Sequence, residues 1–223
     1  AGGKLRVKAV TKKQRRRNPA APFYTSTLQQ EASRKLGFNA RRTMMTAQKL
    51  YEGMDTGDGA QGLITYMRTD SVSLAGEAVT EIREFIAERY GKKNLPSEPN
   101  LYKSKSKNSQ EAHEGIRPTS IKRTPEQVKA FLNDDQFKLY NLIWQKFVSS
   151  QMNPAKSKVT TAIFTHPHAE EAGVDTARFV AQGEVSVFDG HLRVFGTDRA
   201  DKDQALPPLE QGKEYKPEKV EGT

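Results

Sequence analysis

The spacing of apolar residues changes twice along this chain, and this change limits the folds open to it. From Lys4 to Val10, apolar and charged residues alternate, as they do in a half-buried strand. From Ser26 to about Met152, apolar residues recur every three or four positions, as in amphipathic helices. From Val159 onward the alternation returns. We therefore predict an α+β fold in which a helix-rich segment is inserted into a discontinuous, mainly β domain.

The expected domain boundaries follow from this pattern. Residues 1–25 and 153–223 form the β domain, and residues 26–152 form the helix-rich domain. The prolines between Asn18 and Pro22 break regular structure between the two. Asp189-Gly190 has the composition of a hairpin turn. The C-terminal strands are expected over residues 159–165, 178–181, 184–188 and 191–195.

Helix ends are marked by capping residues and glycines. A short buried strand is expected over Gly62–Tyr66, and a mobile loop rich in Lys, Ser, Asn and Pro over residues 91–110. The helix signals are, in chain order, a Ser26/Gln29 capping box ending at Gly37, an Asn39 cap ending at Gly53, a helix over 73–90 ending at Gly91, a Thr124 cap with Pro125 at the first helical position, and a last helix that ends before Pro154.

Charge and composition narrow the function classes. Residues 1–25 hold eight Lys or Arg and no acidic residue, which favours a polyanion partner such as nucleic acid. Arg15, Arg16 and Arg17 are candidate contacts to a DNA backbone, and a solvated loop is the alternative. The absence of cysteine excludes disulfides, thiolate zinc sites and thiol catalysis. No apolar run exceeds three residues, which excludes a membrane span.

Two segments carry residues suited to phosphodiester chemistry. Tyr66, Arg68 and Asp70 alternate, so an extended chain projects all three from one face. A phenol, with a pKa near 10, leaves more readily than a sugar hydroxyl, so cleavage by a tyrosine is easily reversed. Arg68 can hold a phosphate oxygen, and His113 can bind phosphate with Asp70 favouring its charged form. The alternative is a half-buried tyrosine beside a surface ion pair, and spacing alone does not choose between them.

Longer stretches around these residues resemble the active-site region of bacterial DNA topoisomerase I, in the type IA family. The resemblance is clearest over residues 22–156, and Met67 favours the topoisomerase I branch over the topoisomerase III branch. The matching segments are Gly62-Leu-Ile-Thr-Tyr-Met-Arg-Thr-Asp-Ser71, Gln110-Glu-Ala-His-Glu-Gly-Ile-Arg-Pro-Thr119, Pro22-Phe-Tyr-Thr-Ser-Thr-Leu-Gln-Gln-Glu-Ala-Ser33, Ala47-Gln-Lys-Leu-Tyr-Glu-Gly53, Leu142-Ile-Trp144 and Pro154-Ala-Lys156.

The resemblance implies a role for each of these residues. Tyr66 is expected to be the nucleophile that links to a 5′ phosphate of DNA, and Arg68 to contact the scissile phosphate. His113 and Asp70 are expected at the phosphate. Arg117 lies in the same motif and is a further candidate for binding DNA or phosphate, although the resemblance gives it no firm role. The implied activity is transient cleavage and religation of one DNA strand, which relaxes negative supercoils. The implied fold is a helix-turn-helix-like active-site domain inserted into a β domain that arches over the DNA.

The same resemblance implies parts that this sequence lacks. The family binds Mg²⁺ through an acidic cluster of a separate toprim domain, and it has a further gate domain. No metal site is expected in this chain, since Asp55-Thr-Gly-Asp58 has the composition of a turn. We therefore expect a piece of a longer cytoplasmic enzyme of the bacterial nucleoid, which is inactive or nearly so without its remaining domains. The alternative is a non-catalytic module that binds single-stranded DNA.

Overall fold

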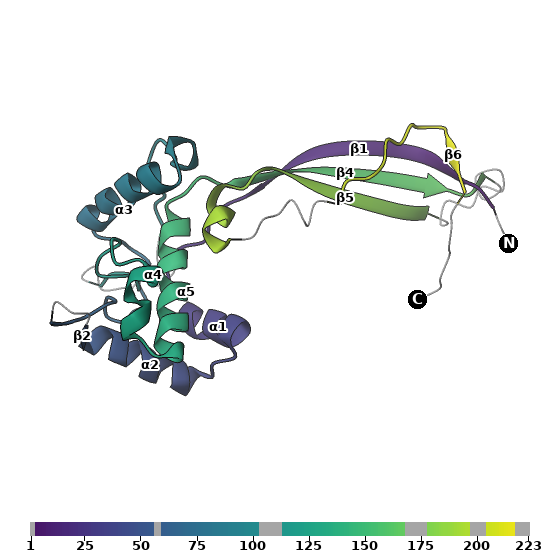
Figure 1. The fold of residues 1–223 in the computed structure, drawn as a ribbon. Coiled ribbons are helices and arrows are strands. Elements are labelled where there is room, and N and C mark those ends of the chain that lie inside the picture. The colour runs from purple at the N-terminus through teal and green to yellow at the C-terminus, as the bar shows by residue number, and fades with distance from the viewer. Residues whose placement is uncertain (1–2, 56–58, 103–112, 168–177, 197–203, 217–223) are drawn as a thin grey trace. The chain divides into compact units, whose positions relative to one another are not determined.

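The computed structural model of this chain describes residues 3–55, 59–102, 113–167, 178–196 and 204–216 (Figure 1). The chain forms two compact units. The sheet unit comprises residues 1–17, 155–189 and 197–223, and the helical unit comprises residues 18–154 and 190–196. Residues 18–25 and 190–196 thus lie with the helices, and not with the strands as predicted from the sequence.

The sheet unit is one antiparallel sheet with the strand order β5-β4-β1-β6. Three long strands lie side by side, and β6 pairs only with the start of β1 (Figure 1). The N-terminal and C-terminal parts of the chain therefore share a sheet, as predicted. The strands are β1 (Leu5–Arg17), β4 (Ala155–Thr165), β5 (Arg178–Phe188) and β6 (Glu214–Tyr215).

Two strands of this sheet are longer than their side chains predict. β1 continues from Val10 to Arg17, because the backbone of its charged half still pairs with β4 through to Arg17 and Ala155. β5 runs unbroken through Gly183, which pairs with Thr160, so the two strands predicted in this region are one. The solvated loop considered for Arg15 to Arg17 is therefore a strand.

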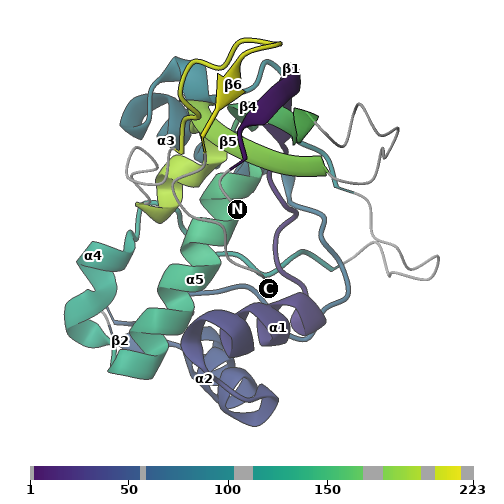
Figure 2. The same cartoon turned by 90° about the vertical axis from the view of Figure 1, so that its right-hand side faces the viewer.

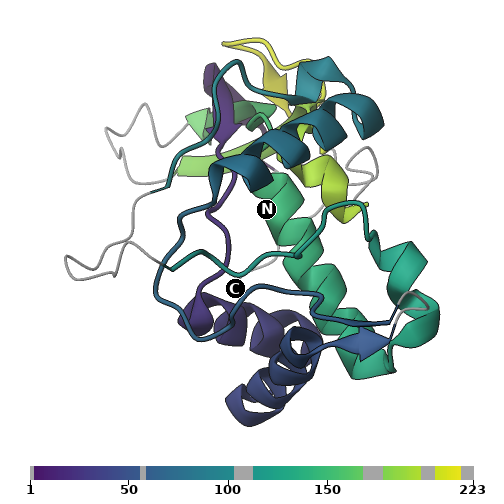
Figure 3. The ribbon, with the colours of Figure 1, turned by 90° about the vertical axis from the view of Figure 1, so that its left-hand side faces the viewer.

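The helical unit is built around α5 (Asp134–Ser150), against which α1, α2, α4 and η3 pack (Figures 2 and 3). No described helix is long and apolar enough to cross a lipid bilayer. The remaining elements are α1 (Thr25–Leu36), α2 (Ala40–Glu52), a two-stranded ribbon of β2 (Met54–Asp55) and β3 (Ala60–Gln61), α3 (Gly76–Arg89), α4 (Pro125–Val128), and the 3₁₀ helices η1 (Lys92–Asn94), η2 (Lys129–Phe131) and η3 (Gly190–Phe195).

The core of this unit is the apolar face of α5. Tyr140, Ile143 and Phe147 are buried, and Trp144 packs edge-to-face against Phe85 with ring centroids 5.6 Å apart. The Tyr140 hydroxyl donates to the Arg123 carbonyl at 2.6 Å, and the Trp144 indole N–H donates to the Ile121 carbonyl at 3.3 Å. Trp144 is thus a core residue, as its helical spacing indicates.

Several helix ends follow their capping residues. The Asn39 side chain accepts a hydrogen bond from the Arg42 amide, and Gly37 ends α1 in the left-handed conformation with φ of 69°. Thr124 caps α4 with Pro125 at the first position, as predicted. The predicted Ser26/Gln29 capping box is wrong, because α1 begins at Thr25. The helix predicted over 73–90 begins at Gly76.

The hairpin predicted at Asp189-Gly190 is wrong. Residues 190–195 form η3, in which His191, Leu192 and Val194 are buried. Gly190 has φ of 49°, and a Cβ atom there would lie 2.4 Å from the Asn153 carbonyl oxygen. The glycine therefore permits a close approach to the end of α5, and the residues after it pack on the helical core instead of returning along β5.

The structure also differs from the predictions for two short segments, residues 62–66 and 91–110. Residues 62–66 are held by a single bridge between Ile64 and Pro118 and do not form a strand. The part of the predicted 91–110 loop that is described, residues 91–102, is packed, since the Asn100 side chain donates to the carbonyls of Ser150 and Met152. Residues 103–110 lie outside the described residues.

Candidate active site

The two candidate segments lie together in the helical unit, joined by main-chain hydrogen bonds. The Thr65 amide donates to the Arg117 carbonyl at 2.9 Å, and the Thr119 amide donates to the Leu63 carbonyl at 3.0 Å. The residues before α1 join the same network, because the Ile116 amide donates to the Phe23 carbonyl at 2.7 Å. The topology thus brings three segments that are far apart in the sequence to one place.

The residues from Tyr66 to Ser71 alternate between exposed and buried. Tyr66 is 45% exposed, and Arg68 and Asp70 are also exposed, whereas Met67, Thr69 and Ser71 are buried. Tyr66, Arg68 and Asp70 are therefore the exposed residues of this segment, and we call them the exposed row. The backbone bends at residues 65, 67 and 68, so the segment is not the extended strand that the alternation assumed.

A single threonine fixes the backbone beneath this row. The Thr25 hydroxyl lies 2.8 Å from the Met67 carbonyl and accepts a hydrogen bond from the Thr69 amide at 2.9 Å. The Thr25 amide donates to the Thr69 carbonyl at 3.0 Å. The first residue of α1 thus holds the two buried positions that separate the exposed site residues. Sequence reasoning missed Thr25, whose one signal is its place at a helix start.

A second threonine joins the row to the His113 turn. The Thr65 hydroxyl donates to the Gly115 carbonyl at 2.9 Å and accepts from the Arg117 amide at 3.0 Å. Gly115 is buried, and its amide donates to the Ser73 carbonyl. Because Thr65 directly precedes Tyr66, these bonds couple the position of the tyrosine to that of the turn.

His113 and Arg117 differ sharply in their surroundings. His113 is exposed at the start of the described turn. The Arg117 guanidinium instead donates to both carboxylate oxygens of Glu114, at 2.7 and 3.2 Å, and to the Pro118 carbonyl at 3.0 Å. Its side chain is only 13% exposed. Arg117 was a candidate phosphate-binding residue, but these contacts indicate instead that its side chain holds the turn in place.

The Tyr66 ring has an aromatic neighbour that spacing does not reveal. It packs edge-to-face against Tyr51, near the end of α2, with ring centroids 5.4 Å apart and an interplanar angle of 63°. The Leu63 amide donates to the Leu50 carbonyl at 2.8 Å, which fixes the end of α2 to the start of the Tyr66 segment. The Tyr66 ring thus packs against Tyr51 on one side, and the residue remains exposed to solvent.

A half-buried cation lies close to the same network. The Lys146 ammonium sits 5.1 Å from the centroid of the Phe23 ring. Burial lowers the pKa of Lys146, and the nearby Glu31 carboxylate partly opposes this shift. Phe23 therefore contacts a cation through its ring and the Ile116 amide through its carbonyl.

The described residues do not fit a Mg²⁺ site. Among them there is no group of three or more His, Asp or Glu side chains placed to hold a metal ion. Asp55 is exposed in β2, while Asp58, the other acid of the Asp55-Thr-Gly-Asp58 turn, lies outside the described residues.

Arg15, Arg16 and Arg17 lie in the sheet unit, at the end of β1. They pair with Ser157, Lys156 and Ala155 of β4, and all three are exposed. Alternation along the strand places Arg16 on the opposite face from its two neighbours. A hollow of about 440 Å³ at this end of the sheet is lined by Arg15, Arg16, Arg17, Ala155, Lys156, Ser157 and Glu184.

The fold is shared with a solved bacterial topoisomerase. The structure of full-length topoisomerase I from Thermotoga maritima superimposes with a TM-score of 0.80 at 38% sequence identity, and the match covers 96% of this chain and 33% of that one. A discontinuous sheet with an inserted helical unit that exposes this tyrosine is therefore the α+β fold of a type IA topoisomerase.

The sequence comparisons identify the family. The family model described as DNA topoisomerase matches residues 1–223, and the chain belongs to this family. DNA topoisomerase 1 of Xylella fastidiosa is 46% identical over 221 residues, which is 99% of this chain and 27% of the relative. DNA topoisomerase 1 of Campylobacter jejuni is 45% identical over 215 residues, 96% of this chain and 29% of the relative. The chain thus spans less than a third of these relatives.

Proposed function

We propose that this chain supplies the strand-cleaving tyrosine of a type IA DNA topoisomerase, and that Tyr66 is the nucleophile. The observation that carries the proposal is the exposed row of Tyr66, Arg68 and Asp70 on a backbone held from beneath by Thr25. The Tyr66 oxygen attacks the phosphorus of a DNA phosphodiester, and the bond to the 3′ oxygen breaks. The products are a 5′ phosphate ester on the tyrosine and a free 3′ hydroxyl.

Resealing is the reverse reaction. The 3′ hydroxyl attacks the phosphotyrosine, the phenol leaves, and the original phosphodiester is restored. One phosphodiester bond is exchanged for another in each direction, so no external energy source is required. The acidity of the phenol relative to a sugar hydroxyl makes it a usable leaving group.

Neighbouring side chains act on the phosphate. Arg68 stabilises the negative charge that develops on the non-bridging oxygens, because a guanidinium presents a fork of donors to them. His113, which is exposed at the start of its turn, binds the phosphate by hydrogen bonding, and Asp70 is assigned to the same site. The ion pair of Glu114 with Arg117 keeps the His113 turn in place.

The remaining machinery is assigned to segments outside this chain. We propose that the longer polypeptide supplies Mg²⁺ through a toprim domain, a group that takes the phenol proton, and the gate domain through which a strand passes. The intact enzyme relaxes negative supercoils, and the 223-residue chain alone forms little or no covalent product.

Labelled single-stranded DNA tests this proposal. A polypeptide that carries this chain together with the other segments of the full-length relatives is mixed with Mg²⁺ and with DNA labelled at either end, then run on a denaturing gel. The 3′ label is expected to migrate with the protein and the 5′ label to be released on a shortened strand. Tyr66→Phe is expected to retain DNA binding without forming the adduct. An adduct that carries the 5′ label, or one formed by Tyr66→Phe, contradicts the assignment.

A further inference from the structure

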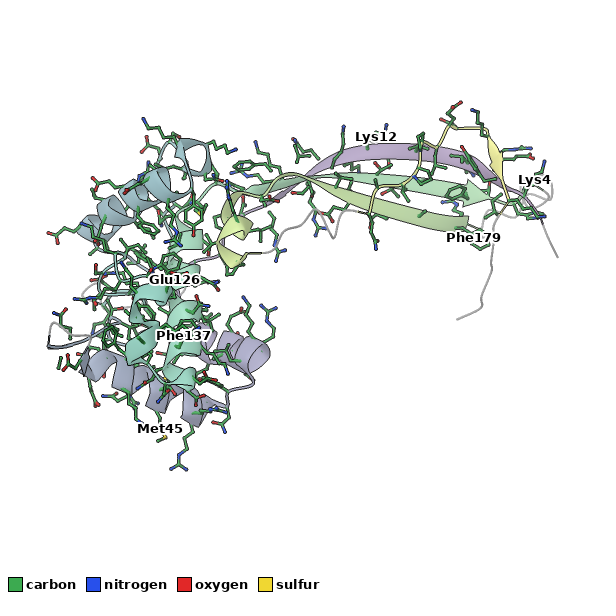
Figure 4. All side chains as sticks on the ribbon, viewed as in Figure 1. Lys4, Lys12, Met45, Glu126, Phe137 and Phe179 are labelled. Atoms are coloured by element: carbon green, nitrogen blue, oxygen red, sulfur yellow. The ribbon has the colours of Figure 1, made fainter. Side chains whose placement is uncertain are left out.

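Tyr51 and Met45 are large side chains that α2 leaves exposed, and they lie differently. Met45 is 55% exposed and points away from the other helices into solvent (Figure 4). Tyr51, in the last turn of α2, packs edge-to-face against Tyr66 and is 40% exposed. It does not belong to the apolar core that the described residues of the helical unit form. The contact with Tyr66 is therefore what distinguishes this ring from an ordinary exposed side chain.

The backbone of Tyr51 is fixed to the segment that carries Tyr66. The Leu63 amide donates to the Leu50 carbonyl at 2.8 Å. Gly62 runs so close to α2 that a Cβ atom on it would lie 2.7 Å from the Tyr51 carbonyl oxygen, so a larger residue does not fit there without a shift of the backbone. The end of α2 can therefore move away from the Tyr66 segment only if these contacts break.

The backbone at Tyr66 is fixed as well, but its side chain has more freedom. The Thr65 hydroxyl donates to the Gly115 carbonyl and accepts from the Arg117 amide, which holds the residue directly before Tyr66. A tyrosine that is 45% exposed can adopt more than one χ1 rotamer, and attack on a phosphate requires one that directs the phenol toward it. An edge-to-face pair of rings is strong enough to favour one rotamer by about two- to tenfold.

We propose that Tyr51 is a positioning residue for strand cleavage, and that its ring holds the Tyr66 ring in the rotamer from which the phenol attacks. The proposal rests on the proposed function, because it takes Tyr66 as the nucleophile. The ring of Tyr51 carries the effect, since the observed contact is between the two rings. Tyr51 thus raises the rate of the cleavage step and adds little to the affinity for DNA.

Two substitutions separate the ring of Tyr51 from its hydroxyl. Tyr51→Phe keeps the ring and removes the hydroxyl. Tyr51→Leu keeps an apolar side chain that favours helix but removes the ring. Phe131→Leu is the matched control, because Phe131 is an aromatic residue of η2 that is 44% exposed and lies outside the candidate site.

A first measurement reports the Tyr66 side chain directly and does not depend on cleavage. In the 223-residue chain with labelled tyrosine, the couplings between the Hα and Hβ protons of Tyr66 give its χ1 populations by NMR. One rotamer is expected to dominate in the unaltered chain, in Tyr51→Phe and in Phe131→Leu. In Tyr51→Leu, the ratio of this rotamer to the others is expected to fall about two- to tenfold. Unchanged populations in Tyr51→Leu overturn the proposal.

A second measurement follows adduct formation by the longer polypeptide with Mg²⁺ and single-stranded DNA. The rate is measured at saturating DNA in a single turnover, and the dissociation constant is measured separately. Tyr51→Leu is expected to slow adduct formation about two- to tenfold while the dissociation constant stays the same. Tyr51→Phe and Phe131→Leu are expected to keep the rate of the unaltered polypeptide, so that the ring alone restores it.

Two kinetic results contradict the positioning role in different ways. Equal slowing in Tyr51→Phe and Tyr51→Leu means that the hydroxyl takes part in the reaction. Weaker DNA binding in Tyr51→Leu, with an unchanged rate at saturation, assigns the ring to stacking on a DNA base.

Tyr66→Phe, measured alongside, separates this proposal from the proposed function. An adduct formed by Tyr66→Phe contradicts the proposed function itself. An adduct that requires Tyr66 but forms at the full rate in Tyr51→Leu contradicts only the positioning role of Tyr51.

Discussion

The replacement of Thr25 by Val tests whether Thr25 holds the backbone of the exposed row, Tyr66, Arg68 and Asp70. Valine keeps the branched shape of threonine but removes the hydroxyl that accepts from the Thr69 amide and reaches the Met67 carbonyl. The Thr69 carbonyl keeps its bond from the residue 25 amide, so two groups lose a partner. Both belong to buried residues, since Met67 is 0% and Thr69 is 7% exposed.

The size of the effect follows from these two groups. A buried donor or acceptor left without a partner costs about 1–3 kcal/mol. The residues between and beside them, Arg68 and Tyr66, are exposed, so water can reach this segment and the sum falls toward the lower end. We expect Thr25→Val to lower the free energy of unfolding of the helical unit by about 2–3 kcal/mol. Thr25→Ser, which keeps the hydroxyl, is expected to lose less than about 1 kcal/mol.

Tryptophan fluorescence during urea unfolding is a suitable assay, because the single tryptophan, Trp144, is buried in the helical unit. For a slope of about 2 kcal/mol per M, the midpoint of Thr25→Val shifts down by about 1 M urea. Ser26→Ala, which removes a neighbouring exposed hydroxyl, serves as the control. A shift for Thr25→Val no larger than that of Ser26→Ala refutes the reasoning. In the longer polypeptide, the same variant is expected to slow adduct formation while DNA affinity is retained.

Three further predictions concern the turn at Gly190, the half-buried Tyr102 and the His113 turn. Gly190→Ala is expected to lower the free energy of unfolding by roughly 3 kcal/mol, because residue 190 has a positive φ and its Cβ would meet the Asn153 carbonyl. Gly37 also has a positive φ but faces open space, so Gly37→Ala is expected to lower it by roughly 1 kcal/mol. The urea midpoints of both variants check this difference. Burial raises the pKa of Tyr102 to about 12, so its contribution to stability is complete below the ordinary value of about 10 and is lost as pH rises toward 12. Tyr102→Phe is expected to flatten the fall in the urea midpoint over that range, and an unchanged slope would count against the assignment. Arg117→Lys keeps the charge but cannot form the fork with Glu114, so it is expected to reduce the rate of adduct formation without weakening DNA binding; equal losses in both would point to phosphate contact instead.

Local capping chemistry made much of the helical unit predictable. Asn39 and Thr124 begin helices, and Gly37 ends one, because each signal depends on a few neighbouring residues and no distant contact competes with it. The alternation at Tyr66, Arg68 and Asp70 was predictable for the same reason. Its buried positions, Met67 and Thr69, are the ones held by Thr25, and no neighbouring strand is needed.

Predictions failed where a distant contact decided the local structure. Asp189-Gly190 has the composition of a hairpin, but its glycine serves a close approach to Asn153, and the apolar residues after it are buried against the helices. β1 extends through a run of cations because its backbone pairs with β4, which side-chain hydrophobicity does not report. Thr25 and Tyr51 were not predicted as residues of the site, because the residues that they contact lie on other segments of the chain.

Mapping the covalent adduct to a residue tests the central claim most directly. The adduct formed by the longer polypeptide on single-stranded DNA is digested with nuclease and trypsin, and the nucleotide-bearing peptide is sequenced by mass spectrometry. The expected tryptic peptide runs from Leu50 to Arg68 and holds two tyrosines, Tyr51 and Tyr66, which fragmentation distinguishes. The proposed function predicts a nucleotide joined through its 5′ phosphate to Tyr66. A nucleotide on Tyr51, or on a peptide from another part of the polypeptide, would contradict it.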